Sequence, residues 1–264
     1  MDFLDRLKLA GRQARRGADN LAVYARHLLE GNRAPHVSAT AVSQCVASES
    51  GSRVPVLLLQ GYFANRGSVQ LLARRLYDRG YVVFTYRLGG LNTGDIRDTA
   101  AHIARKVESI VEQTGLQQVD IAGHSMGGLV GLFYVKQLDR KRRVRTLVLL
   151  GSPVGGTWSA LLGFFAEPFG AARQLLPTST FLRVLKEGPL PEGVRLFTIT
   201  GQNDWFAPVR MALLPGAQNI ILPTTHSGLL VEEATADALD RVLSGRSRED
   251  IRTTGFVDDP GTSP

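Results

Sequence analysis

A serine flanked by glycines is the residue of this chain best suited to act as a nucleophile. Ser125 is the centre of the Gly-His-Ser-Met-Gly segment 123–127, which follows a short predicted strand, 119–122, and precedes a helical pattern at 129–138. A strand that turns sharply into a helix at Gly-x-Ser-x-Gly presents the serine oxygen at the sheet edge and at a helix N-terminus, where negative charge is favoured. The pentapeptide alone is common, but in this context it predicts a nucleophilic serine.

A serine hydroxyl is a weak nucleophile at neutral pH and needs a base. After a strand–turn–helix nucleophile, the base is expected to be a histidine late in the chain, preceded by an acid. Of the five histidines, His226 follows a late apolar run and precedes the last predicted helix. The others fit less well: His27 and His36 precede the core, His102 lies within a predicted helix, and His124 adjoins the serine and so points elsewhere. His226 is therefore the predicted base.

The predicted acid is Asp204, at the tip of the turn that follows the apolar run 194–200. A carboxylate there would hold the imidazole in one tautomer and stabilise the imidazolium. The alternative is that the pair Asn203-Asp204 only forms a turn. Asp237 and Asp240 lie within the last predicted helix and fit the role poorly.

Two backbone amides are predicted to stabilise the oxyanion of an acyl-transfer reaction. One belongs to Met126, directly after the nucleophile, and the other is expected in the loop 60–68 after the first core strand. Gly61 allows close approach there, and Tyr62 is the predicted second donor among several competing amides.

Apolar runs alternate with helical patterns through the rest of the chain, which predicts a mostly parallel sheet with helices on both faces. Helices are predicted at 67–79, 95–114, 125–139 and 227–243, and a short strand is consistent with 41–47. The six predicted core strands are 54–59, 81–86, 119–122, 145–150, 194–200 and 219–222.

Four blocks within residues 54–243 resemble the lipase and esterase branch of the α/β-hydrolases, and small bacterial lipases in particular. They are 59–62, 123–128, 150–157, and 201–204 taken with 225–230. The resemblance implies the α/β-hydrolase fold and the cleavage of carboxylic esters, acyl or lipid-like, through an acyl-enzyme, with no cofactor and no metal. Gln60 stands where such lipases usually have histidine, and Val154 replaces another frequent histidine. Both departures leave the predicted triad in place and bear on the choice of substrate.

Two other functions remain open at this point. An acyltransferase would use the same acyl-enzyme with an alcohol in place of water. A non-catalytic, membrane-associated binding protein on the same fold is disfavoured by the intact set Ser125, Asp204 and His226.

Residues 152–192 are predicted to form a short cap inserted between two late strands of the hydrolase domain, 54–245. The segment is rich in large apolar side chains, which could line an acyl pocket or simply pack on the core. The candidate pocket residues are Phe63, Trp158, Leu161, Phe164 and Phe165.

Residues 1–53 are predicted to form an amphipathic helix, 3–30, and a connection. The favoured interpretation is that the helix packs on the main domain, and the alternative is that it lies on an anionic membrane. Arginines occupy the other face, and the apolar stripe is Leu4, Leu7, Ala10, Ala14, Ala18, Leu21, Tyr24 or Ala25, and Leu28.

The composition of the 264 residues narrows the partners and the cellular location. The net charge of +7 comes without a nucleic-acid motif, and the densest basic block, 140–145, is expected to be a solvated helix end, so no nucleic acid is predicted. No apolar run approaches the roughly 20 residues that span a bilayer, and no secretory signal is seen. A cytoplasmic protein is expected, with a peripheral membrane contact as the alternative. The lone Cys45 excludes an internal disulfide, the polar segment 246–264 is a predicted disordered tail, and nothing indicates the oligomeric state.

Overall fold

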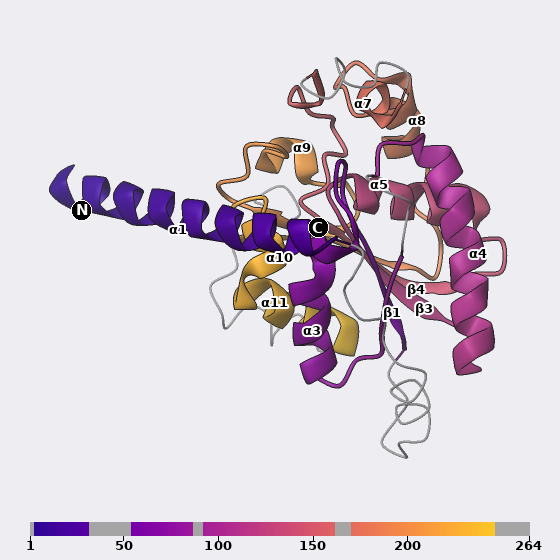
Figure 1. Ribbon diagram of the computed structural model, residues 1–264. Coiled ribbons are helices and arrows are strands. Elements are labelled where there is room, and N and C mark those ends of the chain that lie inside the picture. The colour runs from indigo at the N-terminus through magenta and orange to yellow at the C-terminus, as the bar shows by residue number, and fades with distance from the viewer. Residues whose placement is uncertain (1–2, 32–53, 87–91, 162–169, 246–264) are drawn as a thin grey trace.

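The structure, a computed structural model, describes residues 3–31, 54–86, 92–161 and 170–245, with side chains from residue 11 onward. Helices flank a central sheet on both sides (Figure 1). The predicted strand at 41–47, the predicted tail at 246–264 and the cap residues Phe164 and Phe165 lie outside the described residues.

Six parallel strands form the sheet in the order β2-β1-β3-β4-β5-β6. The four central strands are almost wholly buried, because helices cover both faces, and this explains why they read as continuous apolar runs. The predicted α/β fold with about six parallel core strands is confirmed. The strands are β1 (Val56–Leu59), β2 (Val83–Thr85), β3 (Val119–His124), β4 (Val144–Leu150), β5 (Arg195–Gly201) and β6 (Gln218–Leu222).

Alternate residues of each strand serve two separate apolar layers. Leu57 and Leu59 of β1 pack with α4 (Ile96–Thr114), α5 (Met126–Phe133) and α8 (Thr180–Lys186). Val56 and Leu58 point the other way, into the layer formed with α3 (Gln70–Asp78), α10 (Gly228–Val231) and α11 (Glu233–Ser244). The sheet is therefore a rigid platform held from both sides.

The order of the strands reverses between β1 and β3. The chain leaves β1 for β2 on one side and then returns to β3 on the other side of β1. In parallel sheets of this kind, ligands bind outside the carboxyl ends of the strands at such a switch point. The loop after β1 and the turn after β3 are thus brought together at that edge.

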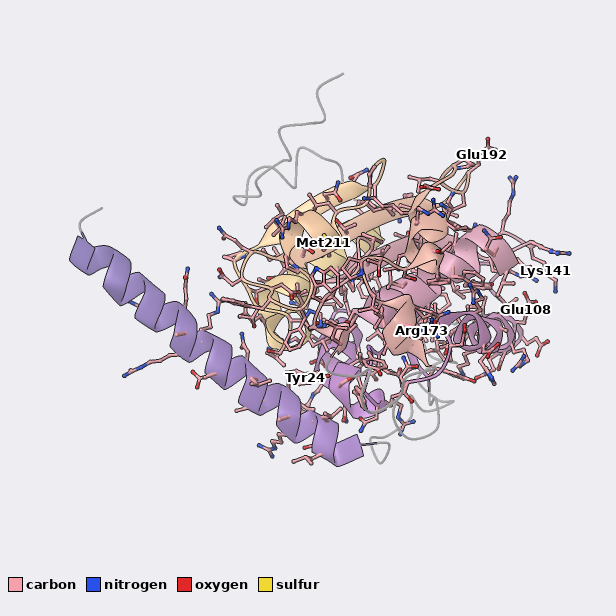
Figure 2. The ribbon with its side chains drawn as sticks, turned by 90° about the horizontal axis from the view of Figure 1, so that it is seen from above. Tyr24, Glu108, Lys141, Arg173, Glu192 and Met211 are labelled. Atoms are coloured by element: carbon pink, nitrogen blue, oxygen red, sulfur yellow. The ribbon has the colours of Figure 1, made fainter. Side chains whose placement is uncertain are left out.

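The predicted N-terminal helix is present as α1 (Phe3–Glu30), and its N-terminal half extends beyond the rest of the molecule in both views (Figures 1 and 2). Its packed side differs from the predicted apolar stripe. The partly buried residues of its second half are Gly17, Asn20, Tyr24, His27 and Leu28, whereas Ala14, Ala18, Leu21 and Ala25 of the stripe are exposed. No helix among the described residues is long and apolar enough to cross a membrane.

Polar contacts explain this difference in α1. Arg16 and Asn20 both donate to the Glu232 carboxylate, with Arg16 Nε to Oε1 at 2.8 Å and Asn20 Nδ2 to Oε1 at 2.6 Å. Asn65, before the 3-10 turn η2 (Arg66–Val69), donates to the carbonyl of Leu28 at 2.9 Å. Gly67 lies so close to the carbonyl of His27 that a Cβ there would be 2.1 Å from it. The helix is held by hydrogen bonds and a close backbone approach more than by its apolar stripe.

Two predicted helices are interrupted. The pattern at 227–243 is split into α10 and α11 at Glu232, whose extended backbone (φ −91°, ψ 144°) ends one helix and begins the next. The pattern at 125–139 becomes α5 followed by a π-helical turn, η3 (Tyr134–Leu138). Two short helices, α7 (Ala171–Gln174) and α9 (Val209–Ala212), complete the described elements.

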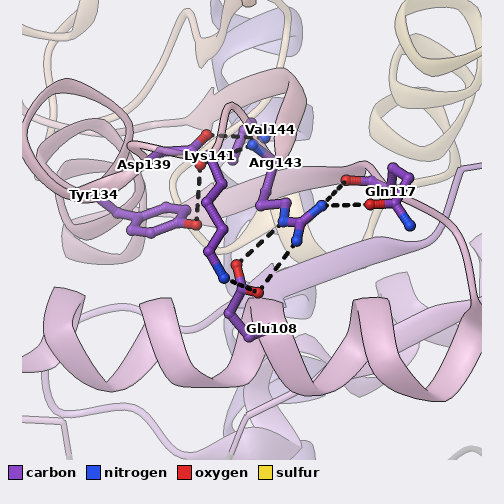
Figure 3. Close-up of polar contacts among 7 residues, drawn as sticks. All are labelled: Glu108, Gln117, Tyr134, Asp139, Lys141, Arg143 and Val144. Carbon is purple, nitrogen blue, oxygen red and sulfur yellow. Dashed lines mark hydrogen bonds and ion pairs between the residues drawn. The ribbon is translucent and has the colours of Figure 1, made fainter.

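The basic block 140–145 is only partly the solvated helix end that was expected (Figure 3). Arg140, Lys141 and Arg142 are exposed, but Arg143 is largely buried against Glu108 of α4, with Nε 3.2 Å from Oε1. Its Nη1 also lies 2.7 Å from Oε1 of Gln117. The block therefore ties β4 to α4 by specific ion pairs, which periodicity along one helix could not reveal.

Candidate active site

Ser125 occupies the sharp turn between β3 and α5. Its backbone has φ 54° and ψ −125°, in a region that residues other than glycine rarely adopt. The flanking glycines are required by contact: a Cβ on Gly123 would lie 2.4 Å from the carbonyl of Gly127, and one on Gly127 would lie 2.6 Å from the Leu59 carbonyl. The turn thus holds Ser125 at the carboxyl edge of the sheet and at the N-terminus of α5, as the motif predicted.

Asp204 and His226, the predicted acid and base, are in direct contact. Oδ2 of the aspartate lies 2.7 Å from Nδ1 of the imidazole, and the aspartate side chain is fully buried. Its Oδ1 accepts hydrogen bonds from the amides of Phe206 at 2.9 Å and Ala207 at 2.7 Å. Because a carboxylate oxygen accepts, the tautomer of a neutral imidazole that fits this contact carries its proton on Nδ1 and its lone pair on Nε2.

Ser125 and His226 line the same cavity, whose volume is about 520 Å³. Gly61, Tyr62 and Phe63 of the loop after β1 form another part of its wall. A Cβ on Gly61 would lie 2.9 Å from the Cβ of Ser125, so the loop passes directly over the nucleophile. The structure therefore brings Ser125, His226 and the predicted oxyanion loop together, with Asp204 behind the imidazole.

The contacts of the loop after β1 bear on the choice of oxyanion donors. Met126 is the first residue of α5 and follows the serine directly. The amide of Phe63 donates to the carbonyl of Asn92 at 3.3 Å, and that of Ala64 donates to the carbonyl of Gly61 at 3.4 Å. The amides of these two competitors of Tyr62 are therefore already hydrogen-bonded.

Asn92 is a site residue that the sequence reasoning missed. Its buried side chain donates from Nδ2 to the carbonyl of Gln60 at 3.2 Å, and its own amide donates to the carbonyl of Ala64 at 3.1 Å. It braces the loop after β1 at two points, Gln60 and Ala64. The available signal was its place after β2, the strand next to β1, which brings the two loops to the same edge.

His124 also has a role that was not predicted. Its ring lies 4.5 Å from that of His226 between centroids, and its Nε2 is 3.1 Å from the backbone carbonyl of His226. Burial lowers the pKa of His124 well below its usual value, with the nearby His226 adding to the effect, so the ring is neutral. A neutral ring that donates from Nε2 holds the loop of His226 in place without adding charge.

Gly151, at the end of β4, supports the aspartate–histidine pair by being small. Its φ is +53°, and a Cβ there would lie 2.9 Å from Oδ2 of Asp204 and 3.3 Å from Nδ1 of His226. A side chain at this position would therefore press on the hydrogen bond itself. The sequence showed the glycine within a resemblance block but not the reason for it.

The predicted pocket residues have mixed outcomes. Phe63 lines the cavity, whereas Trp158 and Leu161 are exposed and are not among its lining residues, although their neighbours Thr157 and Ala160 are. Phe164 and Phe165 lie outside the described residues. The wall instead includes residues that were not predicted, namely Gly17, Leu21 and Tyr24 of α1, together with Trp205 and Phe206 after β5. Sequence periodicity could not reveal them, because it does not identify the segments that meet across the fold.

Comparison with known families and with solved structures agrees with the fold described above. A family model described as the alpha/beta hydrolase fold matches residues 54–185, half of the chain. The mature lipase BlEst2 of Bacillus licheniformis is 18% identical, with a TM-score of 0.64 over 75% of this chain and 94% of that one.

Two longer enzymes share the fold as well. Aspergillus fumigatus lipase B is 18% identical, with a TM-score of 0.63, and the match covers 79% of this chain but 58% of the lipase. Phospholipase PlaB of Legionella pneumophila is 14% identical, with a TM-score of 0.63, and the match covers 76% of this chain and 62% of the phospholipase. At these identities the likeness concerns the fold.

Proposed function

Since this chain belongs to the α/β-hydrolase family, we propose that it is a serine hydrolase that cleaves carboxylic esters of an acyl or lipid-like kind. The observation that carries the proposal is the buried Asp204 bound to Nδ1 of His226, with His226 and the strained Ser125 on the wall of one cavity. A hydrogen-bonded acid and base that share a cavity with a serine are the groups that activate an alcohol as a nucleophile.

In the proposed reaction, Oγ of Ser125 attacks the carbonyl carbon of the ester while Nε2 of His226 takes the serine proton. The tetrahedral oxyanion accepts hydrogen bonds from the backbone amides of Tyr62 and Met126. As the C–O bond breaks, His226 returns the proton to the leaving alcohol, and an acyl-serine remains. Water then attacks the acyl-serine while His226 takes its proton; as the bond between the acyl carbon and Oγ breaks, His226 returns the proton to Oγ of Ser125 and the acid is released.

The cavity favours an uncharged, apolar acyl group. Its lining includes the side chains of Leu21, Tyr24, Phe63, Leu175 and Phe206, and no Asp, Glu, Lys or Arg is among the lining residues that the structure describes. A volume of about 520 Å³ is within the range of pockets that hold small organic ligands. We therefore expect acyl esters with several methylene groups to be better substrates than acetates.

The test is turnover of p-nitrophenyl esters of increasing acyl length, together with labelling by a fluorophosphonate probe. We expect labelling at Ser125 and a rise in kcat/KM from acetate toward longer chains, since each buried methylene contributes about 0.8 kcal/mol. A competing acceptor alcohol in the assay separates hydrolysis from acyl transfer by the products formed. Absence of labelling in folded protein, with no turnover of any ester, would contradict the proposal.

A further inference from the structure

An apolar stripe of α1 is left without a partner among the described residues. Ala14, Ala18, Leu21, Ala25 and Leu29 are all exposed, with Leu21 at 58% and Leu29 at 88%. At 3.6 residues per turn they fall within an arc of about 80° on the helix surface. The arc lies beside the face that packs on the body of the molecule, and its side chains are exposed to solvent.

This stripe is continuous with the mouth of the cavity. Leu21 belongs to both, because it lies in the stripe and lines the cavity. Three other lining residues are exposed aromatic side chains: Phe63 at 36%, Phe206 at 54% and Trp205 at 89%. Large aromatic side chains, tryptophan above all, are favoured at the boundary between hydrocarbon and water. The entrance of the proposed active site is therefore surrounded by apolar groups that meet solvent.

Positive charge borders the stripe. Arg12, Arg15 and Arg26 are exposed on the side of α1 next to Leu29, and Arg26 has 81% of its side chain accessible. Between residues 11 and 30 the helix carries four arginines against one aspartate and one glutamate. An apolar stripe edged by arginines is the pattern of a helix that lies in the plane of an anionic lipid surface.

We infer that the α1 stripe and the exposed aromatic residues at the cavity mouth form one docking surface for an anionic lipid–water interface. The N-terminal half of α1 projects from the body of the molecule (Figure 2), and Leu21, farther along the same helix, lines the cavity. A second copy of the chain is a poorer occupant, because it would bring a second set of arginines against the first. That the lipid also supplies the ester rests on the proposed function, whereas the docking itself does not.

The first test measures binding without turnover. Full-length Ser125→Ala protein is sedimented with vesicles of phosphatidylcholine alone and of phosphatidylcholine mixed with phosphatidylglycerol. We expect binding to the anionic vesicles that weakens as salt is raised, because attraction to surface charge is screened within a Debye length. Protein that stays in the supernatant with anionic vesicles at low salt would overturn the inference. Binding without any esterase activity in the wild type would retain the docking surface and reject only the proposed function.

The second test locates the surface with matched variants. Ala18→Glu combined with Leu29→Glu places charge in the stripe at residues that do not line the cavity, and should weaken vesicle binding at least about tenfold. The control is Val184→Glu on α8, where an aliphatic side chain is 58% exposed away from the cavity. Both proteins should keep wild-type melting temperatures and turnover of soluble esters. Equal loss of vesicle binding in both would refute the assignment, as would a dimer in size-exclusion chromatography that the stripe variant dissociates.

Discussion

The two ends of strands β3 and β4 are built from opposite kinds of interaction. At the carboxyl ends, Ser125 has a strained backbone and the described lining of the cavity contains no Asp, Glu, Lys or Arg. Toward the amino ends, the fully buried Asp120 of β3 is paired with Arg145 of β4. The comparison teaches that ion pairs secure the end that only has to be stable, whereas the end that can perform chemistry combines a strained serine with a single carboxylate, Asp204, held behind His226.

The surroundings of the amino ends reinforce this contrast (Figure 3). Glu108 of α4 holds both Lys141, with Nζ 2.9 Å from Oε2, and Arg143. The hydrogen bond from Arg143, with that from Lys141, lowers the pKa of Glu108. Asp139 accepts from the amides of Arg143 and Val144 at 2.8 and 2.9 Å, so the entry into β4 is fixed by a carboxylate. None of the residues in these contacts is among the described lining of the cavity.

The largest expected effect concerns the carboxyl end. Ser125→Ala should lower ester turnover by roughly 10³- to 10⁶-fold, and His226→Ala by a similar factor, because the two groups act as a unit. Melting temperatures should stay close to that of the wild type. The measurement is kcat/KM on a soluble p-nitrophenyl ester, and Ser109→Ala on α4 is the control. A folded Ser125→Ala protein with wild-type turnover would remove the proposed nucleophile.

The second effect concerns the amino ends of β3 and β4. A substitution there should lower the free energy of unfolding and leave the ester turnover of the folded protein unchanged. Arg145→Met leaves Asp120 buried without its ion-pair partner, and we expect a loss of about 3 kcal/mol in the free energy of unfolding. Burial already raises the pKa of Asp120, and Arg145 acts against that rise. The measurement is urea unfolding, with kcat of the folded protein as the second readout.

The double variant Asp120→Asn with Arg145→Met is the matched control for this pair. Removing both charges should recover part of the lost stability, since the uncompensated carboxylate is gone. A large fall in kcat of Arg145→Met with little change in its stability would contradict the proposal that the amino ends of β3 and β4 serve stability and the carboxyl ends serve chemistry.

The smallest expected effect concerns His124, which is expected to position His226 without taking part in the reaction itself. His124→Phe keeps a ring but removes the donor to the carbonyl of His226, and should lower kcat about tenfold, the worth of one hydrogen bond, with KM little changed. His124→Gln, which retains a donor, should lose less. Replacement of the exposed His102 by Ala is the control, and an equal loss in His124→Phe and His124→Gln would argue against positioning through this bond.

For the same variant, His124→Phe, we also predict a change in how the stability of the protein depends on pH. Because burial lowers the folded-state pKa of His124, the unfolded chain binds more protons once the pH falls below about 6.5. The contribution of this histidine to stability is therefore complete above that pH and is lost as the pH falls. His124→Phe should lose less stability than the wild type between neutral and acidic pH, as measured by melting temperature.

Local patterns were sufficient to predict the strands, the nucleophile turn and the identity of Asp204 and His226 as partners. They succeed because a buried parallel strand, a strained serine turn and a fixed chain order each leave a signature in neighbouring residues. Gly151, Asn92 and the role of His124 could not be predicted in this way. Each depends on a contact with another strand or loop, and nothing in its neighbours along the chain reports that contact.

The N-terminal helix also shows what local sequence patterns cannot predict. Its apolar periodicity predicted the helix, and the favoured interpretation was packing through the apolar stripe. The observed contact uses Arg16 and Asn20 against Glu232, at the break between α10 and α11. Periodicity describes the faces of a helix, but only the partner decides which face is used, and that partner lies more than two hundred residues away.

The clamp of Arg16 and Asn20 on Glu232 has a consequence for the order in which the protein is assembled. The wall of the cavity is completed by segments 216 positions apart in the chain. Contacts of such long sequence separation form late, because the intervening chain must be closed first. During synthesis α1 can meet the loop at Asn65 early, but Arg16 and Asn20 stay without Glu232 until nearly the whole hydrolase fold has been made. The sheet can therefore fold before the cavity is complete. The packing of α1 on the body of the molecule is then the step that completes the cavity wall.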